Sequence, residues 1–186
     1  MAYRNGTYVA FDGNGTTDPT KGDMKYYGLL QSWNASNKFE LNFSDSHKKT
    51  YQVKDTSSIR TLQARLLERM KNSKNMLLII SGNTNWDRGM LNFEIEKAVD
   101  YYKIPIIVGY TGYSCILDPG VLEEKWPRAL YERIKNQTAR CIHIPFRQKC
   151  ISAAVSQFSV NNKDDQLTLP LHYYNEKTYI DWGYKE

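Results

Sequence analysis

Two apolar stretches decide the fold: Asn75-Met76-Leu77-Leu78-Ile79-Ile80 and Ile104-Pro105-Ile106-Ile107-Val108-Gly109. Both are short for helices and almost continuously apolar, which is typical of parallel strands that are buried on both faces. The proline of the second stretch stands near its start, where a strand tolerates it. We therefore expect these stretches to be the central strands of a parallel sheet.

Three further strands are expected beside them. Residues 7–11 are rich in β-forming side chains and end at the turn-favouring Asp12-Gly13-Asn14-Gly15. Residues 39–43 and 141–146 alternate apolar and polar side chains, the pattern of edge strands with one solvated face. Because helices are expected between the strands, the pattern predicts an α/β fold: a flavodoxin-like, doubly wound, five-stranded parallel sheet in the order 2-1-3-4-5.

The helices are expected at about residues 23–33, 59–70, 87–102, 121–136 and 148–159. The helix at 59–70 has the clearest signal, because its apolar residues recur at helical spacing and form one stripe. Those residues are Ile59, Leu62, Leu66, Leu67 and Met70. Ser57 or Ser58 is placed to cap the start of this helix.

The C-terminal part of the chain departs from the alternating pattern. We expect one domain over residues 1–160, then an aromatic-rich C-terminal extension over 161–186 that begins with the linker 161–165. Because aromatic rings are first of all packing surface, a strand or hairpin packed on the domain is the default expectation. Contact with a partner or substrate is the alternative. The aromatic residues are Tyr173, Tyr174, Tyr179, Trp182 and Tyr184.

Composition limits the class of protein. The 186 residues carry a formal net charge of +5, but the lysines and arginines are scattered, so no nucleic-acid partner is expected. No apolar run is long enough to cross a bilayer, and the first residues lack the apolar core of a secretion signal, so we predict a cytoplasmic protein without membrane contact. Three cysteines without a CxxC spacing predict a reduced chain and no metal site.

Motifs for common cofactors are missing. The segment after Asp12 lacks the third glycine of a dinucleotide-binding motif, and Thr17 stands where an EF-hand requires glycine. Ser81-Gly82-Asn83 stands where a phosphoacceptor receiver, a protein class of the same topology, needs an aspartate. No P-loop, HExxH or GxSxG sequence occurs. We therefore expect neither a bound cofactor nor a metal ion.

Polar residues gather where the predicted strands end. Ligands of doubly wound sheets bind outside the carboxyl ends of the strands, which makes these positions candidates for substrate binding. There, Phe11 could pack against a ring, and the carboxylates could hydrogen-bond a ribose or only cap turns. The candidates are Phe11, Asp12, Asp45, Ser46, His47, Gly82 and Asn83.

Helical geometry singles out Glu94. On the helix expected at 87–102, Leu91, Ile95 and Ala98 define an apolar face, and Glu94 lies at its border beside Ala98, whereas Glu96 faces water. A carboxylate there can be partly buried, so its pKa can rise. The alternative is a structural glutamate that forms salt bridges along the rim of the helix.

Several blocks in order resemble a known family. They are Thr7-Tyr8-Val9-Ala10-Phe11-Asp12, Phe43-Ser44-Asp45-Ser46-His47, Ile59-Arg60-Thr61-Leu62-Gln63-Ala64-Arg65-Leu66, residues 72–84 and Asn92-Phe93-Glu94-Ile95-Glu96-Lys97-Ala98. Together they resemble the TIR-like domain of the bacterial Thoeris anti-phage defence system over about residues 1–155.

The resemblance implies an enzyme for which NAD+ is the substrate and not a cofactor. Such proteins cleave the bond between nicotinamide and ribose and cyclise the product to a cyclic ADP-ribose isomer. This second messenger activates a separate effector protein, which depletes cellular NAD+. The catalytic glutamate of the family maps onto Glu94. Many TIR enzymes have tryptophan four residues earlier, where this chain has Met90, with Trp86 four residues further back.

Two other functions remain open from the sequence. One is a non-catalytic module in which a TIR-like surface only assembles with other TIR domains, and a homo-oligomer is also compatible with the enzyme. The other is a nucleoside-processing transferase of related fold.

Overall fold

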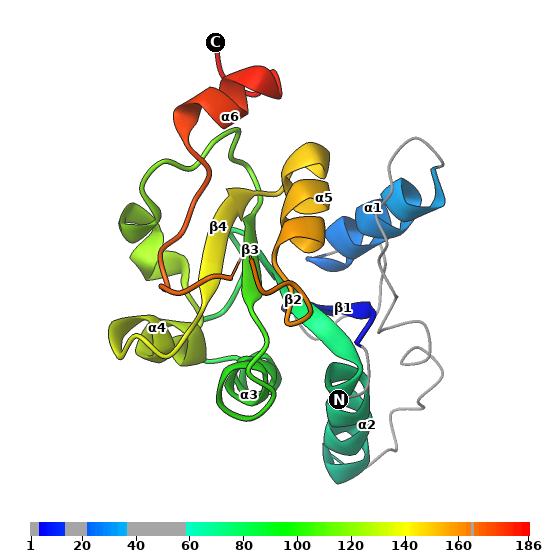
Figure 1. The fold of residues 1–186 in the computed structure, drawn as a ribbon. Coiled ribbons are helices and arrows are strands. Elements are labelled where there is room, and N and C mark those ends of the chain that lie inside the picture. The colour runs from blue at the N-terminus through cyan, green and yellow to red at the C-terminus, as the bar shows by residue number, and fades with distance from the viewer. Residues whose placement is uncertain (1–3, 14–21, 37–58, 165) are drawn as a thin grey trace.

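The computed structural model describes residues 4–13, 22–36, 59–164 and 166–186. These residues form a four-stranded parallel sheet in the order β1-β2-β3-β4 (Figure 1). The strands are β1 (Gly6–Ala10), β2 (Ser73–Ile80), β3 (Ile106–Tyr110) and β4 (Cys141–Pro145). The predicted α/β class and the two central strands are confirmed. The strand expected at 39–43 lies outside the described residues, so the five-strand order stays a prediction.

Helices cover both faces of the sheet. They are α1 (Met24–Ala35), α2 (Ile59–Lys71), α3 (Gly89–Glu96), the π-helical η2 (Lys97–Tyr101), the 3-10 helix η3 (Pro119–Lys125), α4 (Arg128–Lys135), α5 (Gln148–Gln157) and α6 (Glu176–Asp181). Among the described residues, no helix has the length and apolar character that a membrane span requires.

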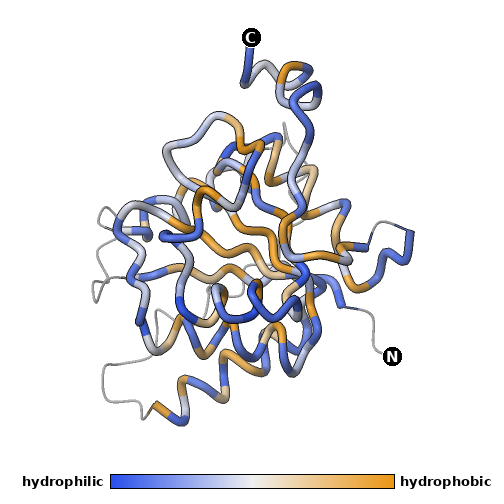
Figure 2. The backbone as a smooth tube through the Cα atoms, turned by 90° about the vertical axis from the view of Figure 1, so that its left-hand side faces the viewer, coloured by the Kyte–Doolittle hydropathy of each residue, from blue (hydrophilic) through white to orange (hydrophobic). Residues whose placement is uncertain are grey.

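Two apolar cores lie on the two sides of the sheet, because successive side chains of a strand point to opposite faces. On one face, Tyr8 and Met76 pack with residues of α2, α3 and α4. On the other face, Val9 and Leu77 pack with residues of α1 and α5. Figure 2 shows the apolar residues concentrated along the inner strands. Continuous burial of β2 and β3 therefore explains why their sequences lack alternation.

The helix expected at 87–102 forms over Gly89–Tyr101 and changes type along its length. Its last turn is π-helical, with Tyr102 N donating to the Lys97 carbonyl at 2.9 Å. The wider turn leaves Ala98 and Val99 buried against the sheet.

The single helix expected at 121–136 is wrong. The structure has η3 and then α4, separated by Trp126 and Pro127. Trp126 adopts an extended conformation with ψ 133°, which is the preference of a residue that precedes proline. Pro127 has no backbone N–H to bond to the preceding turn, so the helix before it ends. A new helix, α4, begins directly after it.

The expected solvated face of β4 is also wrong, because all of its residues are buried. The C-terminal segment (residues 166–186) runs beside this strand. His143 N donates to the His172 carbonyl at 2.8 Å, and His172 N donates to the Cys141 carbonyl at 3.2 Å. The described part of this segment forms neither the strand nor the hairpin that was expected. It makes one isolated bridge, Ile142 to His172, and then α6, whose Tyr179 is fully buried.

A chain of buried hydrogen bonds ties the C-terminal segment to the sheet. Trp126 Nε1 donates to the Tyr110 hydroxyl at 2.7 Å, the hydroxyl bonds to His143 Nδ1 at 2.7 Å, and His143 Nε2 lies 2.9 Å from the Pro170 carbonyl. A carbonyl only accepts, so Nε2 carries the proton and Nδ1 accepts from Tyr110. Burial lowers the pKa of His143 to about 4, so the ring is neutral at pH 7.

Candidate functional site

Glu94 points from α3 toward the sheet. Only 5% of the residue is exposed, and the hydroxyl of the fully buried Tyr8 in β1 donates to Glu94 Oε1. The sequence places Glu94 at the border of an apolar face, but the structure buries it more deeply. The hydroxyl of Tyr8 supplies a polar partner inside the core, which makes this burial tolerable.

Burial controls the charge of this pair. It raises the pKa of Glu94 to about 8, and the hydrogen bond from Tyr8 opposes that rise only in part. Burial and the neighbouring Glu94 also raise the pKa of Tyr8. At pH 7 the free protein therefore holds Glu94 mostly protonated and uncharged. Among the described residues, Glu94 Oε2 has no hydrogen-bond partner.

Asp12 follows the carboxyl end of β1 and is 1% exposed. Its Oδ1 accepts from Arg88 Nε at 2.7 Å, and its Oδ2 accepts from Asn85 N at 3.1 Å. Both contacts come from the loop that joins β2 to α3. Asp12 therefore fixes that loop and the start of the helix that carries Glu94.

Sequence reasoning missed a second carboxyl, that of Asp23. The residue is fully buried at the start of α1, and its side chain makes no capping bond. The Thr84 hydroxyl donates to Asp23 Oδ2 at 3.4 Å, while Oδ1 has no hydrogen-bond partner among the described residues. Burial, and secondarily the charge of Asp12, raise the pKa of Asp23. An aspartate before a helix predicts an ordinary cap, so the sequence gives no signal for this role.

The loop after β2 contains two of the predicted binding residues. Gly82 and Asn83 are exposed at its tip. Asn83 N donates to Ser81 Oγ at 3.1 Å, and Ser81 N donates to Thr84 Oγ1 at 2.9 Å. The loop is therefore held by its own hydrogen bonds and leaves Gly82 and Asn83 open to a ligand. The predicted binding residues Asp45, Ser46 and His47 lie outside the described residues.

Aromatic and apolar neighbours fix the remaining candidates. Phe11 stacks on Tyr27 of α1, with ring centroids 5.4 Å apart. Met90 packs against the core on the α3 side of the sheet. Trp86 is 44% exposed and contacts Tyr131, with centroids 5.3 Å apart. Met90 is thus a packing residue in this structure, whereas Trp86 is the exposed indole of the loop before α3.

The structure brings the predicted residues together only in part. Tyr8 and Ala10 of β1 point to the sheet face that α3 covers with Glu94, and Asp12, two residues beyond the strand, bonds to the loop that leads into α3. Glu94 lines neither the cavity of about 680 Å³ nor the cavity of about 360 Å³ that lie elsewhere on the protein. Among the described residues, no three His, Cys, Asp or Glu side chains are grouped to hold a metal ion.

These features define the class of the protein as a parallel α/β domain with polar groups at the strand ends and a buried glutamate, Glu94, on a helix beside its sheet. The family model described as Thoeris protein ThsB, TIR-like domain, matches residues 8–114. The match covers more than half of the chain and includes both Asp12 and Glu94, so the chain belongs to this ThsB TIR-like family. Membership suggests a role in anti-phage defence.

Proposed function

We propose that the protein is a TIR enzyme that consumes NAD+. It cleaves the bond between nicotinamide and ribose and closes the product into a cyclic ADP-ribose isomer. The product diffuses away and activates a separate effector that depletes NAD+. The observation that carries this proposal is the buried carboxyl of Glu94 beside the Tyr8 hydroxyl, in a chain that belongs to a Thoeris family.

The chemistry needs one carboxylate. When the bond from ribose C1′ to the pyridinium nitrogen breaks, its electron pair leaves with a neutral nicotinamide, so no acid has to protonate the leaving group. The ribose that remains is an oxocarbenium-like cation, as in glycoside cleavage. A carboxylate at a fixed position stabilises the charge that develops in this transition state.

Because burial raises the pKa of Glu94, the protonation state of its carboxyl can change when substrate binds. In the free protein, its pKa of about 8 keeps the carboxyl neutral at pH 7. The cationic pyridinium of a bound NAD+ favours the ionised form of a neighbouring acid. Substrate binding is therefore expected to ionise Glu94, and the low dielectric around it strengthens the attraction to the developing ribosyl cation.

The remaining groups orient the substrate in this proposal. Asp12 holds the loop between β2 and α3 through Arg88 and Asn85. This contact helps to fix the position of α3, and therefore of Glu94, relative to β1. Ring closure requires that water be excluded and that an adenosine hydroxyl be held near the reacting carbon. As the bond from this hydroxyl oxygen to ribose C1′ forms, the hydroxyl proton passes to the carboxylate of Glu94. The residues proposed to line the substrate site are Phe11, Asp12, Asp45, Ser46, His47, Gly82 and Asn83.

Incubation of the purified protein with NAD+, followed by mass spectrometry, tests the proposal. We expect release of nicotinamide and formation of a cyclic ADP-ribose isomer by the wild-type protein. Glu94→Gln should lower turnover by roughly 10²–10³-fold, the cost of losing one transition-state contact. Glu96→Gln is the matched control, because Glu96 lies on the same helix but is half-exposed, and it should keep activity.

Three outcomes would overturn the assignment. Equal release of nicotinamide by the wild type and by Glu94→Gln would remove the catalytic role of Glu94. Self-association without turnover would instead favour an assembly module, and turnover of nucleosides but not of NAD+ would favour a transferase.

A further inference from the structure

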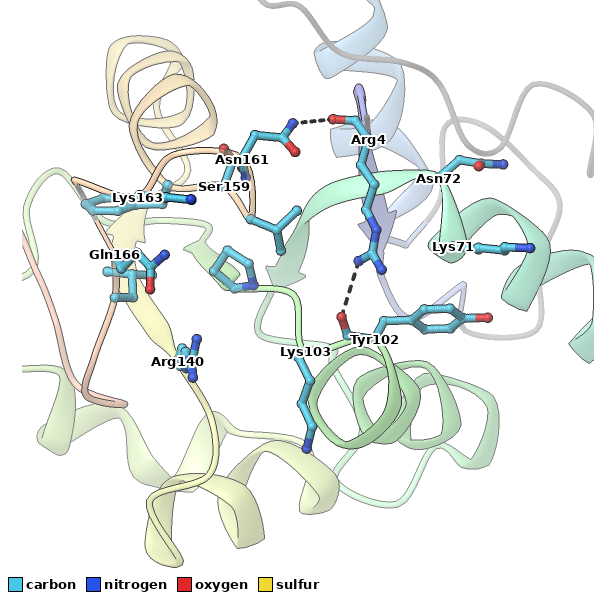
Figure 3. Close-up of a pocket in the computed structure, with 14 residues that line it drawn as sticks. Arg4, Lys71, Asn72, Tyr102, Lys103, Arg140, Ser159, Asn161, Lys163 and Gln166 are labelled. Carbon is cyan, nitrogen blue, oxygen red and sulfur yellow. Dashed lines mark hydrogen bonds between the residues drawn. The ribbon is translucent and has the colours of Figure 1, made fainter. Parts of the chain in front are cut away.

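A cavity of about 680 Å³ lies at the end of the sheet opposite to the candidate site. Its walls come from segments that lead into the strands: Arg4 before β1, Asn72 before β2, Pro105 before β3 and Arg140 before β4. Residues 158–163, which follow α5, complete it. Figure 3 shows these segments around one opening. Its volume falls in the range of sites that hold small molecules.

The charged side chains that line the cavity in the described residues are all positive. Five cationic side chains surround the cavity, and the described lining contains no aspartate or glutamate. In the described part of the chain, none of the five forms an ion pair. They are Arg4, Lys71, Lys103, Arg140 and Lys163. Uncompensated cations around one cavity produce a positive potential that attracts an anion.

One of these cations stands in a strained backbone. Lys103 has a φ of 55°, in the left-handed region that glycine adopts most easily. The conformation is held by the preceding helical turn, because Tyr102 N donates to the Lys97 carbonyl and Ile104 N donates to the Ala98 carbonyl. The chain therefore carries a lysine at a position where glycine would relieve strain.

The base of the cavity is apolar and fixed. Leu167 is 3% exposed and Phe158 is 9% exposed, and Pro105 and Val160 lie beside them. Hydrogen bonds hold the walls in place, because Arg4 Nη1 donates to the Tyr102 carbonyl at 3.2 Å and Asn161 Nδ2 donates to the Arg4 carbonyl at 2.6 Å (Figure 3). A free phosphate would use the cations but leave this apolar base unused.

We propose that this cavity binds a phosphorylated nucleotide at a site distinct from that of Glu94. The arginine and lysine side chains hold the phosphates, because guanidinium groups pair with phosphate oxygens in charge-assisted hydrogen bonds. The apolar surface of Phe158, Val160 and Leu167 receives the base. The proposal does not depend on the NAD+ chemistry at the other end of the sheet.

Calorimetric titration with ATP as the probe tests this site in the full chain. We expect saturable one-to-one binding with a Kd below about 100 μM. Inorganic triphosphate should bind more weakly, because it leaves the apolar base uncovered, and adenosine should bind more weakly still. Arg140→Glu should weaken ATP binding by at least about tenfold. Arg65→Glu reverses an exposed charge on α2 outside the cavity, and it should change the Kd by less than about twofold.

Lys103→Gly tests whether a loss of ATP binding can occur without a loss of stability. The change removes a cation and relieves the left-handed backbone, so ATP binding should weaken while the Tm stays equal or rises. Absence of ATP binding up to about 1 mM, or equal affinity for ATP and triphosphate, would overturn the proposal. So would ATP binding that Glu94→Gln abolishes and Arg140→Glu leaves intact, because that result places the nucleotide at the other end of the sheet.

Discussion

Two buried tyrosines on the same face of the sheet hold titratable partners in different ways. Tyr8 of β1 donates to the Glu94 carboxyl, whereas Tyr110 of β3 links Trp126 to His143. Burial keeps both partners neutral, since it raises the pKa of Glu94 to about 8 and lowers that of His143 to about 4.

The two pairs differ in how completely they are bonded. Both ring nitrogens of His143 have partners, whereas only Oε1 of Glu94 has one among the described residues. A fully bonded buried network specifies a single packing, which here attaches the C-terminal segment. In the proposed function, the second carboxyl oxygen of Glu94 is left for the substrate. Under that proposal, similar burial serves structure at His143 and chemistry at Glu94.

The largest expected effect concerns stability at alkaline pH. Folded protein holds the Glu94 proton up to about pH 8, whereas the ordinary pKa of 4.5 applies after unfolding. Stability from this group is complete below the unfolded pKa and is lost as pH rises through the folded pKa. Replacement by glutamine removes that loss, so Glu94→Gln should be more stable than the wild type at pH 9 by about 4 kcal/mol. Urea unfolding at pH 5 and pH 9 measures the difference.

Glu96→Gln, on the same helix, is the control and should show no such gain. If Glu94→Gln and the wild type keep the same difference in stability at both pH values, Glu94 does not hold its proton in the folded protein.

His143 should produce the opposite pH dependence. Its pKa is lowered from 6.5 to about 4. Between these pH values His143 is protonated in the unfolded chain but neutral in the folded protein. The contribution of His143 is complete above pH 6.5 and is lost as pH falls toward 4, by about 3 kcal/mol in total. The measurement is the slope of unfolding free energy between pH 4 and 6.5. That slope should be smaller in His143→Phe, although this variant is less stable at pH 7.

An unchanged slope in His143→Phe would show that other groups cause the acid sensitivity. Hydrogen exchange of residues 167–172 provides an independent measure, because these backbone groups should exchange faster once His143 is protonated.

Tyr110→Phe should be the most damaging removal of a single hydroxyl. The group bonds to both Trp126 Nε1 and His143 Nδ1, so its loss leaves two buried polar atoms unpaired. We expect a loss of about 2–3 kcal/mol in unfolding free energy. Tyr113→Phe is the control, because Tyr113 packs edge-on against Tyr110 but is half-exposed. A loss of similar size in both variants would contradict a special role for the network.

Tyr8→Phe should have the smallest effect, and its effect should be on catalysis. The Tyr8 hydrogen bond lowers the pKa of Glu94 against the larger effect of burial. Without it the pKa rises further, so the pH profile of NAD+ cleavage should shift to higher pH, with activity at pH 7 reduced by a factor of about two to ten. A uniform drop in rate with an unshifted profile would assign Tyr8 a purely structural role.

The central strands could be predicted from their own sequences. Burial on both faces requires apolar side chains at successive positions, and β2 and β3 are continuously apolar. The burial of Glu94 could be predicted in part for a related reason, since helical periodicity places it next to Ala98 at the border of an apolar face. Its partner could not be identified in the same way. Tyr8 lies 86 residues away, and no local pattern records a contact between a strand and a distant helix.

The prediction for β4 failed because of a similar distant contact. The alternation of Cys141, Ile142 and His143 is real, but Tyr110 and Trp126 pack against His143 on the face that was expected to be solvated, and the C-terminal segment pairs with the edge of the strand. The break at Pro127 had a local signal, since proline rarely lies inside a helix, and the expectation of one helix over 121–136 neglected it. The pKa of Asp23 is raised by its burial and, secondarily, by the charge of Asp12, and only the folded chain produces both effects.

The pairing of His172 with β4 has a consequence for shortened forms of the protein. Without residues 166–186, the outer strand would present unpaired backbone groups at Cys141 and His143, as a template onto which a strand of another molecule can add. Truncation at that point should therefore promote aggregation of the shortened chain. The C-terminal segment thus covers part of the outer edge of the sheet in addition to packing against its core.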